Sequence, residues 1–194
     1  MNNYVFLFWI LKQYKTKFIF NIVVIYYYIL LYEMEMNSND KSSTNAKKYI
    51  MYFDGASRGN PGLSGAGAVI YEQVNNKLVE IWSKSQFIGK SETNNIAEYG
   101  GLILGLKYAV EMDIHHLIVR GDSELVIKQV KGTYKVKSPH LIVLHKTVCD
   151  LNTHFNTIEY QHVYRDKNKR ADELSNLGIQ NNVNTSAFYS LFKK

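Results

Sequence analysis

Several features that would narrow the class of protein are scarce in this sequence. It has one cysteine, Cys149, among 194 residues, so an internal disulfide is excluded. This cysteine usage suits a reducing compartment. No internal repeat is present, which argues against a repeat architecture. The net charge of +6 is a mild basic excess, which is compatible with a polyanionic partner but does not identify one.

No apolar run reaches the roughly 20 residues of a membrane-spanning helix. The longest, FIFNIVVIYYYILLY at 18–32, has 15 residues and includes Asn21, and no A-x-A-like cleavage site accompanies it. Three interpretations of residues 1–32 stay open: a membrane anchor, an upstream extension that is rarely translated, and a packed helix. Lysines before the run and glutamates after it would favour a cytoplasmic N-terminus if it inserted. We otherwise expect an intracellular protein, cytoplasmic or nuclear.

The rest of the chain divides into three segments. Residues 33–47 are polar, rich in Ser and Asn, and are interpreted as a linker. Residues 48–178 carry the pattern of a folded domain, and the 46% apolar content suffices for one hydrophobic core. Residues 179–194 form a polar tail with a short apolar patch, AFYSLF. We expect a monomer.

The hydrophobic pattern within 48–178 predicts an α/β fold with a mixed five-stranded sheet in the order β-β-β-α-β-α-α-β-α. Short links between the first three strands predict an antiparallel meander, and a helix between two strands permits parallel pairing. In the third strand, Val79, Ile81 and Phe87 are expected on one side. The last helix is expected to close at Gly178. The predicted strands are 48–54, 64–73, 78–87, 115–122 and 156–164, and the helices are 94–111, 123–130, one from Ser138 through Leu151, and 168–178.

Four acidic residues occupy related positions in this pattern. Asp54 ends the first strand, before a sharp turn, and Asp122 ends the fourth. Glu98 and Asp172 lie in the first turns of two helices. If the first and fourth strands are parallel neighbours, the four side chains converge, although each acid taken alone fits a solvated surface. Carboxylates packed together repel one another unless cations compensate, and hard oxygen ligands suit Mg²⁺ or Mn²⁺.

Four motifs in order resemble the type 1 ribonuclease H family: DGASRGNPG at 54–62, TNNIAE at 93–98, GDS at 121–123 and NKRADELSN at 168–176. The resemblance covers about residues 48–178. It implies a ribonuclease H-like fold, a mixed five-stranded sheet flanked by helices. It also implies an endonuclease that hydrolyses the RNA strand of RNA/DNA hybrids with two metal ions, leaving 5′-phosphate and 3′-hydroxyl ends.

The resemblance also assigns roles residue by residue. Asp54, Glu98, Asp122 and Asp172 match the metal-binding positions, for Mg²⁺ or Mn²⁺ as a substitute. Asn60 and Asn94 would contact RNA 2′-hydroxyls, and Thr93 would hold a DNA-strand phosphate. Amide side chains both donate to and accept from a 2′-hydroxyl. For Asn60 and Thr93, turn and helix-cap roles are the alternatives.

One departure from the family pattern concerns the loop before the last helix, where many members carry a histidine. Here the link is short, YRDKNK at 164–169, and His162 before it is expected to belong to the strand and to be structural. Arg165 resembles the arginine of the subgroup that lacks the histidine. An arginine cannot act as a base near neutral pH, so its expected role is to hold a phosphate or the product.

A second departure is that the basic handle of some relatives is absent. The stretch KGTYKVKSPH at 131–140 runs directly into the next helix. Lys135 and Lys137 are candidates for contacts with the DNA backbone, and a solvated loop is the alternative.

Two other functions compete with that of a hybrid-specific ribonuclease. A recombinase or DNA nuclease of the same fold would not need the Asn60 and Asn94 pair. A non-catalytic hybrid-binding protein would not need all four carboxylates.

Overall fold

The computed structural model describes residues 47–180. The predicted order of strands and helices is confirmed, with one short 3-10 helix, η1, added before the last helix. The elements are β1 (Lys48–Gly59), β2 (Gly62–Val74), β3 (Lys77–Glu92), α3 (Asn94–Glu111), β4 (His116–Gly121), α4 (Glu124–Val130), α5 (Pro139–Asn152), β5 (Thr157–His162), η1 (Arg165–Lys167) and α6 (Lys169–Gln180).

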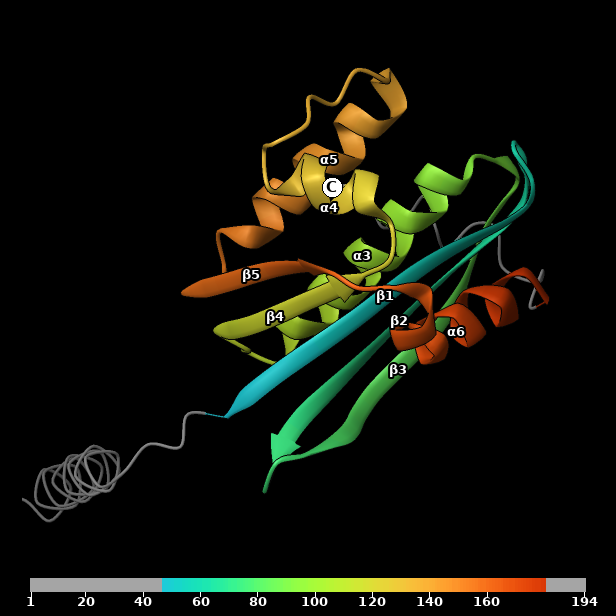
Figure 1. Ribbon diagram of the computed structural model, residues 1–194. Coiled ribbons are helices and arrows are strands. Elements are labelled where there is room, and N and C mark those ends of the chain that lie inside the picture. Colours follow the sequence, from blue (N-terminus) through green and yellow to red (C-terminus); the bar gives the residue numbers. More distant parts are fainter. Residues whose placement is uncertain (1–46, 181–194) are drawn as a thin grey trace, which may run out of the picture. The chain divides into compact units, whose positions relative to one another are not determined.

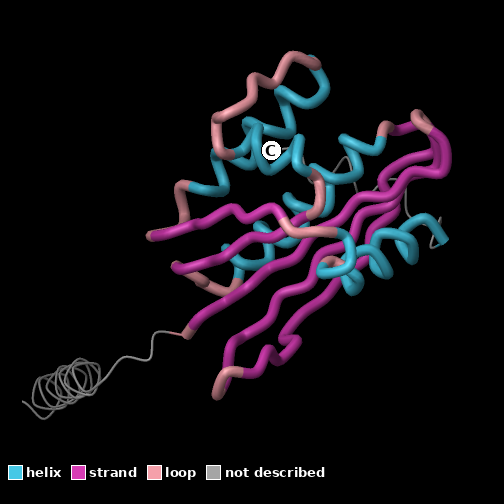
Figure 2. Tube along the Cα trace, in the orientation of Figure 1, coloured by secondary structure: helices cyan, strands magenta, loops and turns pink. Residues whose placement is uncertain are grey.

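The five strands form one mixed sheet in the order β3-β2-β1-β4-β5. β1 pairs antiparallel with β2, and β2 pairs antiparallel with β3, whereas β4 is parallel to both β1 and β5. Helices α3, α4 and α5 cover one face and α6 covers part of the other (Figure 1). Figure 2 shows that β1, β2 and β3 extend well beyond the short strands β4 and β5.

The main hydrophobic core lies between the sheet and the α3, α4 and α5 layer. Phe53 on β1, Val119 on β4, Leu102 on α3 and Val148 on α5 are fully buried within it. Burying such side chains contributes roughly 1.5–3 kcal/mol each. The core therefore fixes how β1, β4 and α3 lie relative to one another, and these three elements carry Asp54, Asp122 and Glu98.

The expected turn directly after Asp54 is wrong. β1 continues to Gly59 and stays paired with β2 up to Gly59 and Gly62, so the chain turns at Asn60 and Pro61. What ends at Asp54 is the parallel pairing with β4, whose last pair is Phe53 with Gly121. The carboxylate therefore marks the point where β1 leaves its parallel neighbour.

Gly178 does not close the last helix, because α6 continues to Gln180. A Cβ at Gly178 would lie 2.5 Å from the carbonyl oxygen of Gln86 on β3. This glycine therefore permits close packing of α6 on the sheet rather than a helix end.

The prediction that Val79, Ile81 and Phe87 lie on one side of the third strand is also wrong. A register shift opposite Ile70 and Tyr71 of β2 puts Val79 and Phe87 on opposite faces of β3. Phe87 is buried, whereas Val79 and Ile81 are exposed. A bulge of this kind interrupts the two-residue alternation on which the prediction relied.

The proposed anchor, most of the linker and nearly all of the tail lie outside the described residues 47–180. Within those residues, no helix has both the length and the apolar character needed to cross a membrane.

Candidate active site

Three of the four predicted carboxylates meet where β1 and β4 separate. Asp54 and Asp122 each follow the last residue of the parallel pair, and Glu98 reaches them from the second turn of α3. Asp54, Glu98 and Asp122 each offer one oxygen, and these three oxygens lie within 4.8 Å of one another. Three hard ligands are thus brought together from three separate elements.

A close contact between β1 and α3 brings Glu98 into this cluster. Gly55 directly follows Asp54, and a Cβ at its position would lie 2.0 Å from the backbone nitrogen of Glu98. No side chain fits in that space, so glycine is required for α3 to approach β1 this closely.

The surroundings of Asp54 and Glu98 disfavour their negative charges. Burial and the nearby Asp122 raise the pKa of Asp54 to about 7, although the Ser175 hydroxyl opposes the change. Burial and the Asp54 charge raise the pKa of Glu98 well above its usual value. Glu98 Oε2 is also buried without a hydrogen-bond partner. Buried oxygens that repel one another, one of them unsatisfied, fit a divalent cation.

Asp172, the fourth predicted ligand, is turned toward Arg165. It lies in the first turn of α6, and its Oδ1 accepts a hydrogen bond from Arg165 at 2.5 Å. The Arg165 side chain is mostly exposed, which leaves this ion pair open to solvent. The three-carboxylate cluster therefore does not include Asp172, although the Asp172 charge contributes to raising the pKa of Asp54.

Two further residues of α6 and its approach were missed by sequence reasoning. Asn168 is buried and donates from Nδ2 to Asp122 Oδ1 at 2.7 Å and to the Phe53 carbonyl at 2.9 Å. Ser175 is buried and donates from Oγ to Asp54 Oδ2 at 2.5 Å. The signal was present in the motif at 168–176, because spacings of three and four residues place Asn168, Asp172 and Ser175 on one side of a helix.

The three residues expected to contact nucleic acid lie at the start of α3 and the nearby turn. Asn60 Oδ1 accepts a hydrogen bond from the Asn94 backbone N–H at 3.1 Å, which joins the β1–β2 turn to the helix. Thr93 is the N-cap, and its Oγ1 accepts from Ile96 N–H at 3.4 Å. The two asparagines are thus neighbours, and both alternatives considered for Asn60 and Thr93, turn and cap, are realised geometrically.

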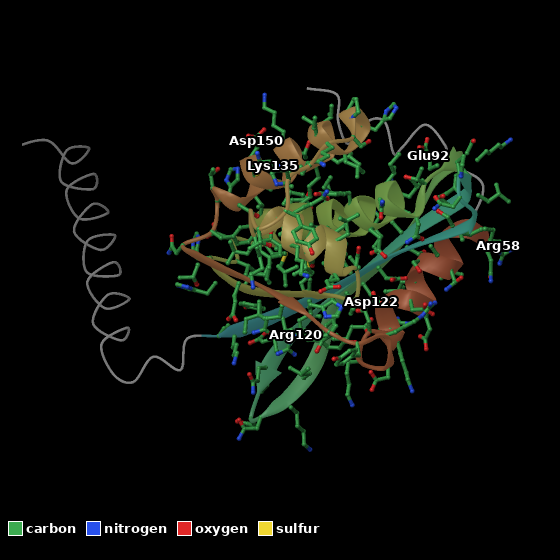
Figure 3. All side chains as sticks on the ribbon, turned by 45° about the horizontal axis from the view of Figure 1, so that its top comes forward. Arg58, Glu92, Arg120, Asp122, Lys135 and Asp150 are labelled. Carbon is green, nitrogen blue, oxygen red and sulfur yellow. The ribbon has the colours of Figure 1, made fainter. Side chains whose placement is uncertain are left out.

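Lys135 and Lys137 are exposed on the connection between α4 and α5. In Figure 3, Lys135 is well separated from Asp122, so it is not part of the carboxylate cluster.

His162 is the last residue of β5, as expected. Its Nε2 donates to the carbonyl oxygen of Asp122 at 3.2 Å. His162 therefore contacts the backbone of Asp122 and not its carboxylate.

The sheet order, the helix layers and the carboxylates at the end of the parallel pair define a ribonuclease H-like fold with an acidic site. A family model described as reverse transcriptase-like matches residues 52–178. With the relatives below, this match shows that the chain belongs to the type 1 ribonuclease H family.

Three solved structures are similar over most of their length. The N-terminal RNase H domain of Rv2228c from Mycobacterium tuberculosis is 39% identical with a TM-score of 0.65, covering 70% of this chain and 95% of that one. RNase H1 from Halobacterium salinarum is 37% identical with a TM-score of 0.63, covering 69% and 98%. LC11-RNase H1, solved in complex with an RNA/DNA hybrid, is 37% identical with a TM-score of 0.62, covering 69% and 97%.

The curated relatives are longer than the matched region. The match is 41% identical over 129 residues with the bifunctional protein Rv2228c and spans 35% of that protein. It is 39% identical over 125 residues with the ribonuclease HI of H. salinarum and spans 61% of that protein.

Proposed function

We propose that this protein is a divalent-metal-dependent endonuclease that hydrolyses the RNA strand of RNA/DNA hybrids. The observation that carries the proposal is the convergence of one oxygen each from Asp54, Glu98 and Asp122 within 4.8 Å, with Asp54 and Glu98 buried and Asp122 half-buried. The family match and the hybrid bound to LC11-RNase H1 support the choice of substrate.

The carboxylates would hold Mg²⁺, or Mn²⁺ as a substitute. Two such ions, when bound, supply an activated water and stabilise charge on the leaving oxygen, which gives 5′-phosphate and 3′-hydroxyl ends. The contribution of the chain is to gather acidic oxygens from three separate elements at one place, where Asp54 and Glu98 are buried. Their mutual repulsion makes the site selective for a cation of high charge.

Asp172 and Arg165 act together in this proposal. The ion pair at 2.5 Å keeps the Asp172 carboxylate beside the cluster while the site is free of substrate. Arg165 is exposed and carries five donors, so it can turn to a phosphate oxygen of the hybrid. It cannot accept a proton, and its role is therefore to bind and orient.

Recognition of the RNA strand falls to Asn60 and Asn94. Their contact joins the β1–β2 turn to the start of α3, the helix that carries Glu98. Amide groups at this position can read a 2′-hydroxyl, which distinguishes RNA from DNA. Thr93 beside them would hold a phosphate of the DNA strand.

Cations lie in two directions from the carboxylates. In Figure 3, Lys135 on the α4–α5 connection lies to the upper left of Asp122, and Arg58 near the β1–β2 turn lies to its right. A duplex that crosses the site would meet Lys135 in one direction and Arg58 in another. Contacts of this kind supply affinity that falls as salt rises.

The test is strand-specific cleavage by the full chain. RNA/DNA, RNA/RNA and DNA/DNA duplexes of one sequence, each strand labelled in turn, are incubated with Mg²⁺, Mn²⁺ or a chelator. We expect cutting of the RNA strand of the hybrid alone, only with metal. Asp122→Asn should lose about 10²–10³-fold in rate, in line with removal of one group that stabilises transition-state charge.

The other outcomes decide between the competing functions. Cutting of DNA would reject the assignment of Asn60 and Asn94 and point to a DNA nuclease of this fold. Binding of the hybrid without cleavage, under every metal condition, would point to a non-catalytic binding protein.

A further inference from the structure

Ser175 is a buried residue of α6 whose hydroxyl group contacts both the Asp54 carboxylate and a backbone carbonyl of its own helix. Its side chain has 0% exposure, and Oγ donates to Asp54 Oδ2 at 2.5 Å. A second acceptor, the Asp172 carbonyl, lies 2.9 Å away. A hydroxyl has one hydrogen, and its bond to Asp54 is the stronger of the two when that carboxyl group is ionised, as it would be beside a bound cation.

The fold fixes the position of this hydroxyl. Gly67 on β2 pairs with Asp54, and a Cβ at Gly67 would lie 2.5 Å from the Ser175 backbone nitrogen. Helix α6 therefore lies directly against the sheet at this point. Ala171 and Leu174 on the same helix are buried as well, and both also lie against Gly67, so Ser175 is held in a packed interface between α6 and the sheet.

Asp54 has two oxygens, and Ser175 engages one of them. We propose that Ser175 is a positioning residue for the divalent cation: it holds Asp54 Oδ2 so that Oδ1 is presented to the ion together with Glu98 and Asp122. This rests on the proposed function in taking the carboxylates as metal ligands. Helix α6 would then contribute two residues to the site, Ser175 and Asp172.

The positioning role has a consequence for metal affinity. A metal ion binds less tightly to a carboxylate that is free to rotate, because binding must then also order the side chain. Removal of a hydrogen-bond partner behind a metal ligand typically lowers metal affinity by 10–100-fold. Ser175→Ala should therefore weaken metal binding without removing any ligand.

The experiment measures Mn²⁺ binding to the full chain by calorimetry, without nucleic acid. We expect the dissociation constant of Ser175→Ala to rise by about 10-fold or more over wild type. The matched control is Tyr160→Phe on β5, away from the carboxylates. This change removes one hydroxyl, which donates a hydrogen bond of 2.7 Å to Asn152 at the end of α5. It should lower the urea midpoint of unfolding and leave Mn²⁺ affinity unchanged.

Unchanged Mn²⁺ affinity in Ser175→Ala, together with a lowered unfolding midpoint like that of Tyr160→Phe, would overturn the proposal and make Ser175 a packing residue. Failure of wild type to bind Mn²⁺ would overturn it as well. Hybrid cleavage is assayed separately across Mg²⁺ concentrations, where Ser175→Ala should regain activity at high Mg²⁺. A wild type that binds Mn²⁺ but cuts no hybrid would reject the proposed function alone, because the positioning role is judged from the binding data.

Discussion

Asp54 brings a negative charge to a position with 5% exposure, beside two other carboxylates. Burial, followed by the charge of Asp122, raises its pKa from 3.8 to about 7. A raised pKa means that the folded protein binds this proton more tightly than the unfolded chain does. In the absence of metal, the site is therefore a source of instability at neutral pH.

The pH dependence of folding follows from that shift. Stability from the protonated Asp54 is fully present below the unfolded pKa of about 4 and is lost as pH rises through about 7. A shift of about 3 units corresponds to roughly 4 kcal/mol at most, at 1.36 kcal/mol per unit. We expect the free energy of unfolding of the metal-free protein, measured in urea, to fall between pH 4 and pH 8.

Asp54→Asn is the matched variant, because the amide keeps the shape and removes the charge. It should be more stable than wild type by about 1–4 kcal/mol at pH 8 and nearly equal to it at pH 4. Because the pKa of Glu98 is also raised, the free energy of unfolding of the variant should still fall somewhat as pH rises. Equal stability of the two proteins at pH 8 without metal would contradict the account.

At the residue scale, the sequence predicts the carboxylates better than their partners. Asp54 and Asp122 could be placed because the ends of parallel strands share one edge of a sheet. The spacing in the motif at 168–176 puts Asn168 and Ser175 on the side of the helix that carries Asp172. Their hydrogen bonds could not be predicted, because these depend on how closely α6 approaches β1 and β2. The pairing of Asp172 with Arg165 depends likewise on the side-chain directions around η1.

At the scale of elements, the site depends on the approach of α3 to β1. The contact is backbone to backbone at Gly55, where a Cβ would lie 2.0 Å from Glu98 N. Any side chain there must move the helix, and with it Glu98, away from Asp54 and Asp122. A small displacement matters because ligand oxygens must lie within coordination distance of one ion.

Gly55→Ala should therefore damage both stability and activity. Overpacking of this kind costs about 1–3 kcal/mol, and we expect hybrid cleavage to fall by more than 10-fold even under conditions where the variant is folded. The measurements are urea unfolding and initial cleavage rates.

Gly105→Ala on the same helix is the control for Gly55→Ala. A Cβ there would meet the flexible end of the buried Met51 side chain and the Cβ of Ala68, and no backbone atom. It should leave hybrid cleavage close to wild type and cost less stability than Gly55→Ala. A Gly55→Ala variant that matched it in both would show that the close contact is not needed.

The order of elements was predictable because each has a clear hydrophobic period and clear boundaries. The helix α5, for instance, begins after the predicted cap Ser138 with a proline in the first turn. The errors arose where tertiary contacts override local signals. β1 runs past Asp54 because β2 continues to pair with it, and Gly178 serves packing on β3 although it resembles a helix end.

At the scale of the whole molecule, the acidic site contrasts with the net charge of +6. The carboxylates gather where the central strand β1 separates from β4, while Lys135 and Arg58 lie apart from Asp122, to its upper left and to its right in Figure 3. Such an arrangement attracts a polyanion to the surface and reserves the centre for cations. Composition alone predicted the attraction of a polyanion but not the acidic centre, because the placement of charge depends on the fold.

The central claim is that these carboxylates direct water, rather than the RNA 2′-hydroxyl, to the phosphodiester. The measurement that tests it most directly is mass spectrometry of the RNA products formed from a hybrid with Mg²⁺ in ¹⁸O-labelled water. The account predicts 5′-phosphate ends that each carry one ¹⁸O atom, and 3′-hydroxyl ends. Products with 5′-hydroxyl and 2′,3′-cyclic phosphate ends, or an uncut RNA strand, would contradict it.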